Sequence, residues 1–75
     1  MHITGTIYGV VYLSQLRRRR FEAGLTQDEL AARVGVSRYA ISQIEQKHVQ
    51  PRVTTIRRLA EVLKCAPSDL MEPEG

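Results

Sequence analysis

Hydrogen-bonding side chains recur along residues 37–46, on one face of a segment that could form a helix. The opposite stripe of the same segment carries Ile41, Ile44 and Glu45. Hydroxyl, amide and guanidinium groups side by side are what a protein needs to bind the base edges in the major groove of DNA. This face therefore predicts hydrogen bonding to a duplex. Its polar members are Ser37, Arg38, Tyr39, Ser42, Gln43 and Gln46.

Two short helices joined by a tight turn would present that face. Thr26 lies three residues before Glu29, which is the spacing of a capping box at the start of a helix. Gly35 can adopt a left-handed conformation and end this helix without a Cβ penalty, and Ser37 can cap the next one. The pattern predicts helix, turn and helix over residues 26–46. The inward face of the first helix consists of Leu30, Ala31 and Val34.

The stretch GLTQDELAARVGVSRYAISQIEQ, residues 24–46, together with Pro51, resembles the helix-turn-helix of the Cro/phage-repressor family, also named the xenobiotic-response-element or XRE family. The resemblance extends over about 13–71. It implies an all-α, five-helix, lambda-repressor-like DNA-binding domain. It also implies that helix 37–46 lies in the major groove of a palindromic operator.

The chain divides into an N-terminal arm at 1–12, a helix-turn-helix domain at 13–71 and an acidic tail at 72–75. Besides the two central helices, we expect helices at 13–23 and 53–63. A short fifth helix should begin at Pro67, where proline suits the first turn. The residues expected to face inward from these helices are Leu13, Leu16, Arg20, Ala23, Val53, Ile56, Leu59, Ala60, Leu63, Leu70 and Met71.

The arm at 1–12 is rich in residues that favour β-strands, interrupted by Gly5 and Gly9. Three alternatives remain open for it. It could be a frayed arm, it could extend the first helix backward from about Val10, or it could form a strand. A strand would need to pair with the same strand of a second copy across a dimer axis, because the chain offers no other strand.

Two charges lie on stripes that otherwise face the core, Arg20 on the first helix and Glu45 on the third. A charge on an apolar stripe needs a partner, so we expect them to form an ion pair, as similar proteins do. The pair would fix the recognition helix against the first helix. The alternative is that both side chains extend to water.

The resemblance also assigns the contacts with DNA. It implies that Gln27 binds a backbone phosphate at a helix N-terminus, where free N–H groups favour an anion. The connection after the third helix would contact the sugar–phosphate backbone. The residues expected to bind DNA are Gln27, Ser37, Arg38, Tyr39, Ser42, Gln43, Lys47 and Arg52.

Composition narrows the remaining possibilities. Residues 1–67 hold 11 basic against 5 acidic residues, a moderate basic bias that suits a phosphate-facing surface. Cys65 is the single cysteine, and neither it nor the histidines belong to a group with metal-ligand spacing, so we expect no metal and no cofactor. The chain lacks a long apolar run and a signal-peptide pattern. We therefore expect a cytoplasmic, nucleoid-associated protein without contact to membranes.

Three functions compete. The first is a small transcriptional regulator, most simply a repressor, that binds double-stranded DNA as a homodimer. The alternative is an antitoxin-type or other protein-interaction module that uses the same fold to bind a protein partner, a toxin or an effector. An enzyme is the third, and the chain lacks a nucleophile–base–acid set and a phosphate-binding glycine loop. The polar face of helix 37–46 favours the first.

Overall fold

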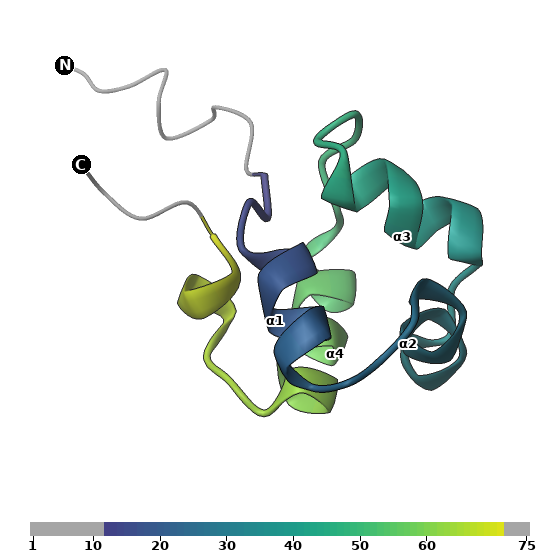
Figure 1. The fold of residues 1–75 in the computed structure, drawn as a ribbon. Helices are drawn as coiled ribbons and strands as arrows, with labels where there is room; N and C mark the ends of the chain where they lie inside the picture. Colours follow the sequence, from purple (N-terminus) through teal and green to yellow (C-terminus); the bar gives the residue numbers. More distant parts are fainter. Residues whose placement is uncertain (1–11, 72–75) are drawn as a thin grey trace, which may run out of the picture.

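The computed structural model describes residues 12–71, and every regular element in this part is helical. The elements are α1 (Leu16–Glu22), α2 (Gln27–Val34), α3 (Arg38–Glu45), α4 (Val53–Leu63) and the 3-10 helix η2 (Pro67–Leu70) (Figure 1). The all-α prediction is confirmed. The predicted fifth helix is a single 3-10 turn, so the described residues hold four α-helices.

Local signals set the ends of α2 and the start of α3. The Thr26 hydroxyl accepts from the Glu29 backbone N–H at 3.0 Å, and the Glu29 carboxylate accepts from the Thr26 backbone N–H at 2.8 Å. Gly35 ends α2 with φ of 86°. The Ser37 hydroxyl then accepts from the Ala40 N–H at 3.0 Å. Both helices therefore begin where the capping residues predicted.

Helix α1 is shorter than predicted at its start. The backbone N–H of Leu16 bonds the Leu13 carbonyl at 3.0 Å in a turn that precedes the helix. At the other end Ala23 is exposed, and its predicted inward orientation was wrong. Ala23 already belongs to the cap of the helix, and Gly24 follows with φ of 73°, so the chain turns away from the core stripe here.

Helix α4 has the predicted bounds, but its first residue does not face the core. The Val53 side chain is 64% exposed, whereas Ile56 and Leu59 on the same stripe are buried. The prediction for Val53 was wrong because α4 begins beyond the region that the described neighbouring helices cover. At its C-terminus Lys64 caps the helix with φ of 57°.

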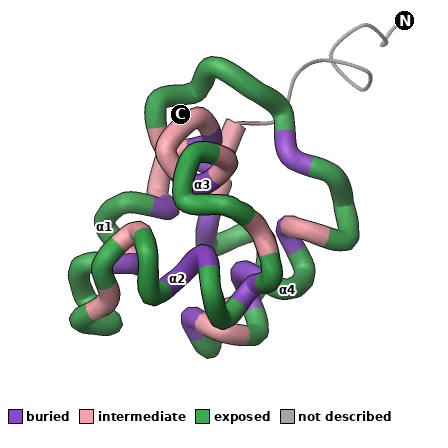
Figure 2. Tube along the Cα trace, turned by 90° about the vertical axis from the view of Figure 1, so that its right-hand side faces the viewer, coloured by how far each residue is buried: buried purple, intermediate pink, exposed green. Residues whose placement is uncertain are grey.

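Buried apolar side chains from every helix meet in one core, and Figure 2 shows the buried segments on the inner sides of the helices. Helix α2 packs against both α3 and α4. The apolar stripe of α3 is thus buried while its opposite face stays free. The core residues are Leu13, Leu16, Leu30, Ala31, Val34, Ile41, Ile44, Ile56, Leu59, Ala60, Leu63 and Leu70.

The turn η2 closes the core beside α1. Leu70 is fully buried, and its carbonyl accepts from the Gln15 backbone N–H at 3.1 Å. Among the described residues, no helix is both long and apolar enough to cross a bilayer. The alternatives for the arm at 1–12 concern residues that lie, except for Tyr12, outside the described part, as do the residues of the tail at 72–75.

Candidate nucleic-acid interface

Helix α3 presents its polar face to solvent because Ile41 and Ile44 hold the other face in the core. Arg38 and Tyr39 form the first turn, directly after the Ser37 cap, and the Tyr39 side chain is 72% exposed. No hydrogen bond to either side chain is formed by the described part of the chain. Both groups are therefore available to a partner at the N-terminal end of α3.

Farther along α3 the polar side chains are held by neighbours on the same segment. The Gln46 side-chain amide donates to the Ser42 hydroxyl at 2.8 Å. The Gln43 side-chain oxygen lies 3.2 Å from Nδ1 of His48, and the His48 backbone N–H bonds the Gln43 carbonyl at 3.0 Å. These contacts restrict the rotamers of two glutamines on the exposed face, which the sequence patterns did not predict.

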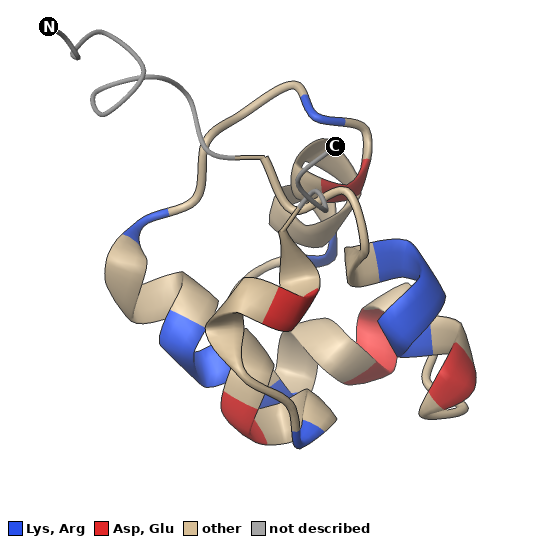
Figure 3. Ribbon diagram, turned by 90° about the vertical axis from the view of Figure 1, so that its left-hand side faces the viewer, with Lys and Arg blue, Asp and Glu red and all other residues tan. Residues whose placement is uncertain are grey.

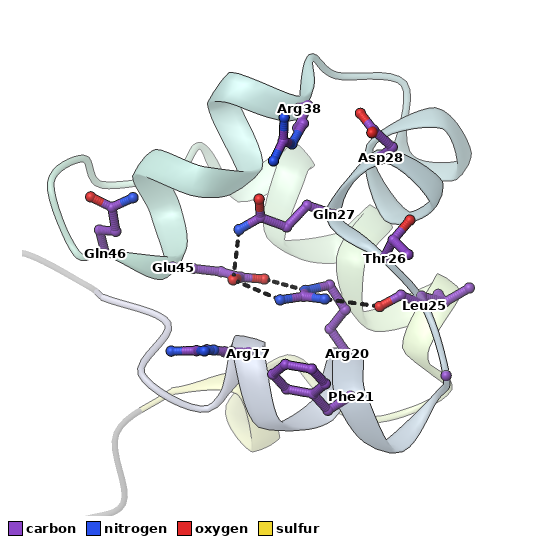
Figure 4. A pocket seen from close by; sticks show the side chains of 11 residues that line it. Arg17, Arg20, Phe21, Leu25, Thr26, Gln27, Asp28, Arg38, Glu45 and Gln46 are labelled. Carbon is purple, nitrogen blue, oxygen red and sulfur yellow. Dashed lines mark hydrogen bonds and ion pairs between the residues drawn. The ribbon is translucent and has the colours of Figure 1, made fainter.

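The ion pair expected between Arg20 and Glu45 is present and joins α1 to the end of α3 (Figure 4). Arg20 Nε donates to one carboxylate oxygen at 2.6 Å and Nη2 donates to the other at 3.1 Å. The two side chains are only 8% and 4% exposed. Arg20 Nη1 also donates to the Leu25 carbonyl at 2.9 Å, so the guanidinium fixes the connection between α1 and α2 as well.

Gln27 extends this buried pair to the start of α2. Its side-chain amide donates to Glu45 Oε1 at 3.1 Å, so Glu45 accepts bonds from two helices. The amide retains one N–H and its oxygen for other partners. The sequence patterns did not predict this contact, which depends on two residues that are 18 positions apart.

The connection from α3 to α4 carries the two remaining site residues. Lys47 and Arg52 are both exposed, while Pro51 between them is buried. Lys47 has φ of 62°, which turns the chain out of α3. Arg52 lies immediately before the first residue of α4. Both cations thus follow the C-terminal end of α3 and not its exposed first turn.

A cleft of about 630 Å³ opens between α1, the first turn of α2, and α3 (Figure 4). The Arg20–Glu45 pair lies on its floor, and Gln27 and Arg38 are the predicted DNA-binding residues that line it. Sequence patterns did not single out the cleft, because its walls come from three helices. Its lining consists of Arg17, Arg20, Phe21, Gly24, Leu25, Thr26, Gln27, Asp28, Arg38, Glu45 and Gln46.

Two titratable groups outside the cleft have pKa values that are shifted from their ordinary values. The backbone N–H of Thr26, and then its hydroxyl, lower the pKa of the Glu29 carboxyl. Burial raises the pKa of the Cys65 thiol, which is partly exposed. Among the described residues, no group of His, Cys, Asp or Glu side chains could hold a metal ion.

The arrangement of α2 and α3 can be compared with known proteins. A family model described as helix-turn-helix matches residues 16–70, which is more than half of the chain. The chain belongs to this helix-turn-helix family, of the XRE type. The match includes the capped helices, the ion pair and all the predicted DNA-binding residues.

Relatives of the helix-turn-helix family agree in sequence and in fold. An uncharacterized HTH-type transcriptional regulator, y4dJ of Sinorhizobium fredii, is 38% identical over 60 residues, covering 80% of this chain and 78% of that protein. The HTH-type transcriptional repressor RghR of Bacillus subtilis is 45% identical over 62 residues, covering 81% of this chain and 46% of RghR, so the chain spans less than half of that relative. The crystal structure of the P22 c2 repressor with a synthetic operator has a TM-score of 0.76 and 31% identity, covering 84% of this chain and 97% of that one.

Family and fold are therefore those of DNA-binding transcription regulators, which are not enzymes. The chemistry of the site agrees, because α3 presents hydrogen-bonding side chains and one cation, Arg38, while Ile41 and Ile44 hold its other face in the core. A surface of this kind binds a polyanion and can distinguish bases.

Proposed function

We propose that this protein binds double-stranded DNA sequence-specifically as a small transcriptional repressor, with α3 in the major groove of a palindromic operator. The observation that carries the proposal is the first turn of α3, where Arg38 and Tyr39 project from a helix whose other face is buried and make no side-chain hydrogen bond within residues 12–71. In helix-turn-helix proteins the N-terminal residues of the second helix contact base edges.

The site residues fall into two groups. Arg38 has the fork geometry to bind O6 and N7 of a guanine, and Gln43 can bind an adenine. Tyr39 can contact a thymine methyl or a phosphate. Contacts to the sugar–phosphate backbone position the protein without specifying sequence, and we assign them to the groups at the edges of the surface. These groups are Gln27, Ser37, Ser42, Lys47 and Arg52.

A homodimer is the species that fits a palindromic operator. A single domain with one recognition helix reaches one half-site, and two-fold symmetry places a second recognition helix about one turn of DNA away. A protein partner, such as a toxin or an effector, is compatible with the same fold and is an outcome of the experiment below.

Selection of binding sites from random duplexes tests the proposal. We expect enrichment of a two-fold symmetric site by the wild-type protein. Arg38→Ala combined with Gln43→Ala should abolish the enrichment, whereas Arg18→Ala should not, because Arg18 lies outside the cleft and near Glu22 on α1. A promoter that carries the enriched site should then be repressed in a reporter assay. Failure to enrich any site at low salt would refute sequence-specific binding and favour a protein partner.

A further inference from the structure

Arg17 and Phe21 line the cleft from α1 and make none of the proposed base contacts. Arg17 and Phe21 lie one turn apart on the exposed side of α1 and form the wall opposite α3 (Figure 4). Phe21 is 60% exposed although it is a large apolar side chain. Neither packing in the core nor the helix-turn-helix itself requires this pair.

The aromatic ring is in contact with two cations of α1, one from the preceding turn and one from the preceding residue. The guanidinium carbon of Arg17 lies 5.4 Å from the ring centroid, and that of Arg20 lies 4.7 Å from it. Arg20 is fixed by Glu45, so it holds the ring in place. The ring in turn restricts Arg17, whose long side chain would otherwise sample many rotamers. Phe21 therefore orients Arg17 along the mouth of the cleft.

The charges at the mouth favour an anion. Arg20 and Glu45 compensate each other on the floor, which leaves Arg17 and Arg38 as cations and Asp28 as the acidic residue. In Figure 4 Arg17 and Arg38 lie on either side of Gln27, and Asp28 lies beyond Arg38. Two cations thus face one uncompensated acid among the residues that line the cleft. Figure 3 colours the basic residues of the chain blue. Of the four consecutive arginines of α1, Arg18, Arg19 and Arg20 each lie beside an acidic side chain, whereas Arg17 has no ion pair with a described residue.

We propose that this cleft holds a backbone phosphodiester of the same DNA duplex that α3 binds, and that Arg17, oriented by Phe21, is a phosphate-binding residue. The inference rests on the proposed function and adds a contact from α1, outside the two helices of the motif. Continuity carries the assignment to DNA: Arg38 belongs both to the mouth of the cleft and to the exposed face of α3. The phosphate next to a major-groove contact is the anion that lies within reach of such a surface.

Salt dependence of DNA binding measures this contact directly. Each phosphate neutralised by a cation adds about 0.9 to the slope of log affinity against log salt. Arg17→Ala should lower the slope by about 0.9, which corresponds to roughly fifteenfold weaker binding at about 0.05 M salt and about fivefold at about 0.15 M. Arg18→Ala is the matched control, since it removes the same charge from the next residue of α1 and should leave the slope close to that of the wild type.

The role of Phe21 has a different signature. Phe21→Ala keeps every cation, so it should weaken binding severalfold while the slope stays within the scatter of the wild type. Phe21→Tyr keeps the ring and should restore the affinity. Arg17→Lys should retain the slope, because the charge remains. All variants are compared below their thermal midpoints, which a circular dichroism melt establishes for each.

The outcomes separate this inference from the proposed function. Equal slopes for Arg17→Ala and Arg18→Ala, with Arg38→Ala combined with Gln43→Ala still abolishing specific binding, would overturn the phosphate contact and leave the regulator intact. No specific binding by the wild type would overturn the proposed function itself. Unchanged affinity in Phe21→Ala, with a lowered slope in Arg17→Ala, would refute only the positioning by the ring.

Discussion

Glu45→Gln should destabilise the fold severely, because it leaves the Arg20 guanidinium buried without a counter-charge. In the native chain Glu45 accepts two bonds from Arg20 and one from Gln27, and its side chain is 4% exposed. A glutamine keeps one oxygen for these donors and turns its own N–H groups toward a cation. The substitution thus removes charge and hydrogen bonding at one position.

The size of the effect follows from burial. Removing one partner of a buried ion pair costs about 3–5 kcal/mol. A chain of 75 residues has a free energy of unfolding of about 4–11 kcal/mol, so this one carboxylate accounts for at least about a quarter of the stability of the fold. The thermal midpoint should fall by at least about 12 °C for a domain of this size.

Urea unfolding monitored by circular dichroism gives the required measurement. Glu22→Gln is the matched control, because Glu22 lies 3.9 Å from Arg18 on an exposed surface where an ion pair contributes about 1 kcal/mol or less. The double variant Arg20→Met with Glu45→Met should be more stable than Glu45→Gln alone, since it removes the uncompensated charge. A Glu45→Gln protein within about 1 kcal/mol of the wild type would refute the reasoning.

Three smaller effects also follow from the structure. Lys64→Gly should stabilise the fold by about 0.5–1 kcal/mol, because Lys64 caps α4 with φ of 57°, whereas Glu61→Gly inside the same helix should destabilise it. The lowered pKa of the Glu29 carboxyl contributes stability that is present above the ordinary pKa of 4.5 and is lost as the pH falls through the pKa of the folded state. Glu29→Gln should therefore lose less stability than the wild type between neutral pH and about pH 3. Equal losses in the two proteins would contradict this. The raised pKa of Cys65 keeps its thiol protonated, so alkylation near neutral pH should be slower than for a free peptide thiol. The stability of the fold should also fall as the pH rises above 9.0. An alkylation rate equal to that of the peptide would contradict the raised pKa.

Local chemistry made the helix-turn-helix predictable from the sequence. Thr26, Glu29, Gly35 and Ser37 act within three or four residues of their own position, so their types alone determine where α2 ends and α3 begins. The ion pair was predictable for a related reason. Two charges on apolar stripes each require a partner, and Arg20 and Glu45 satisfy each other.

The tertiary structure decided what depends on neighbours that are distant in sequence. Val53 continues an apolar stripe and is nevertheless exposed, because burial requires another element above it. Gln27 bonds Glu45, and the cleft opens above the Arg20–Glu45 pair, only because three helices converge there. A sequence pattern records which side of a helix is apolar, but the packing of the helices determines which polar groups meet.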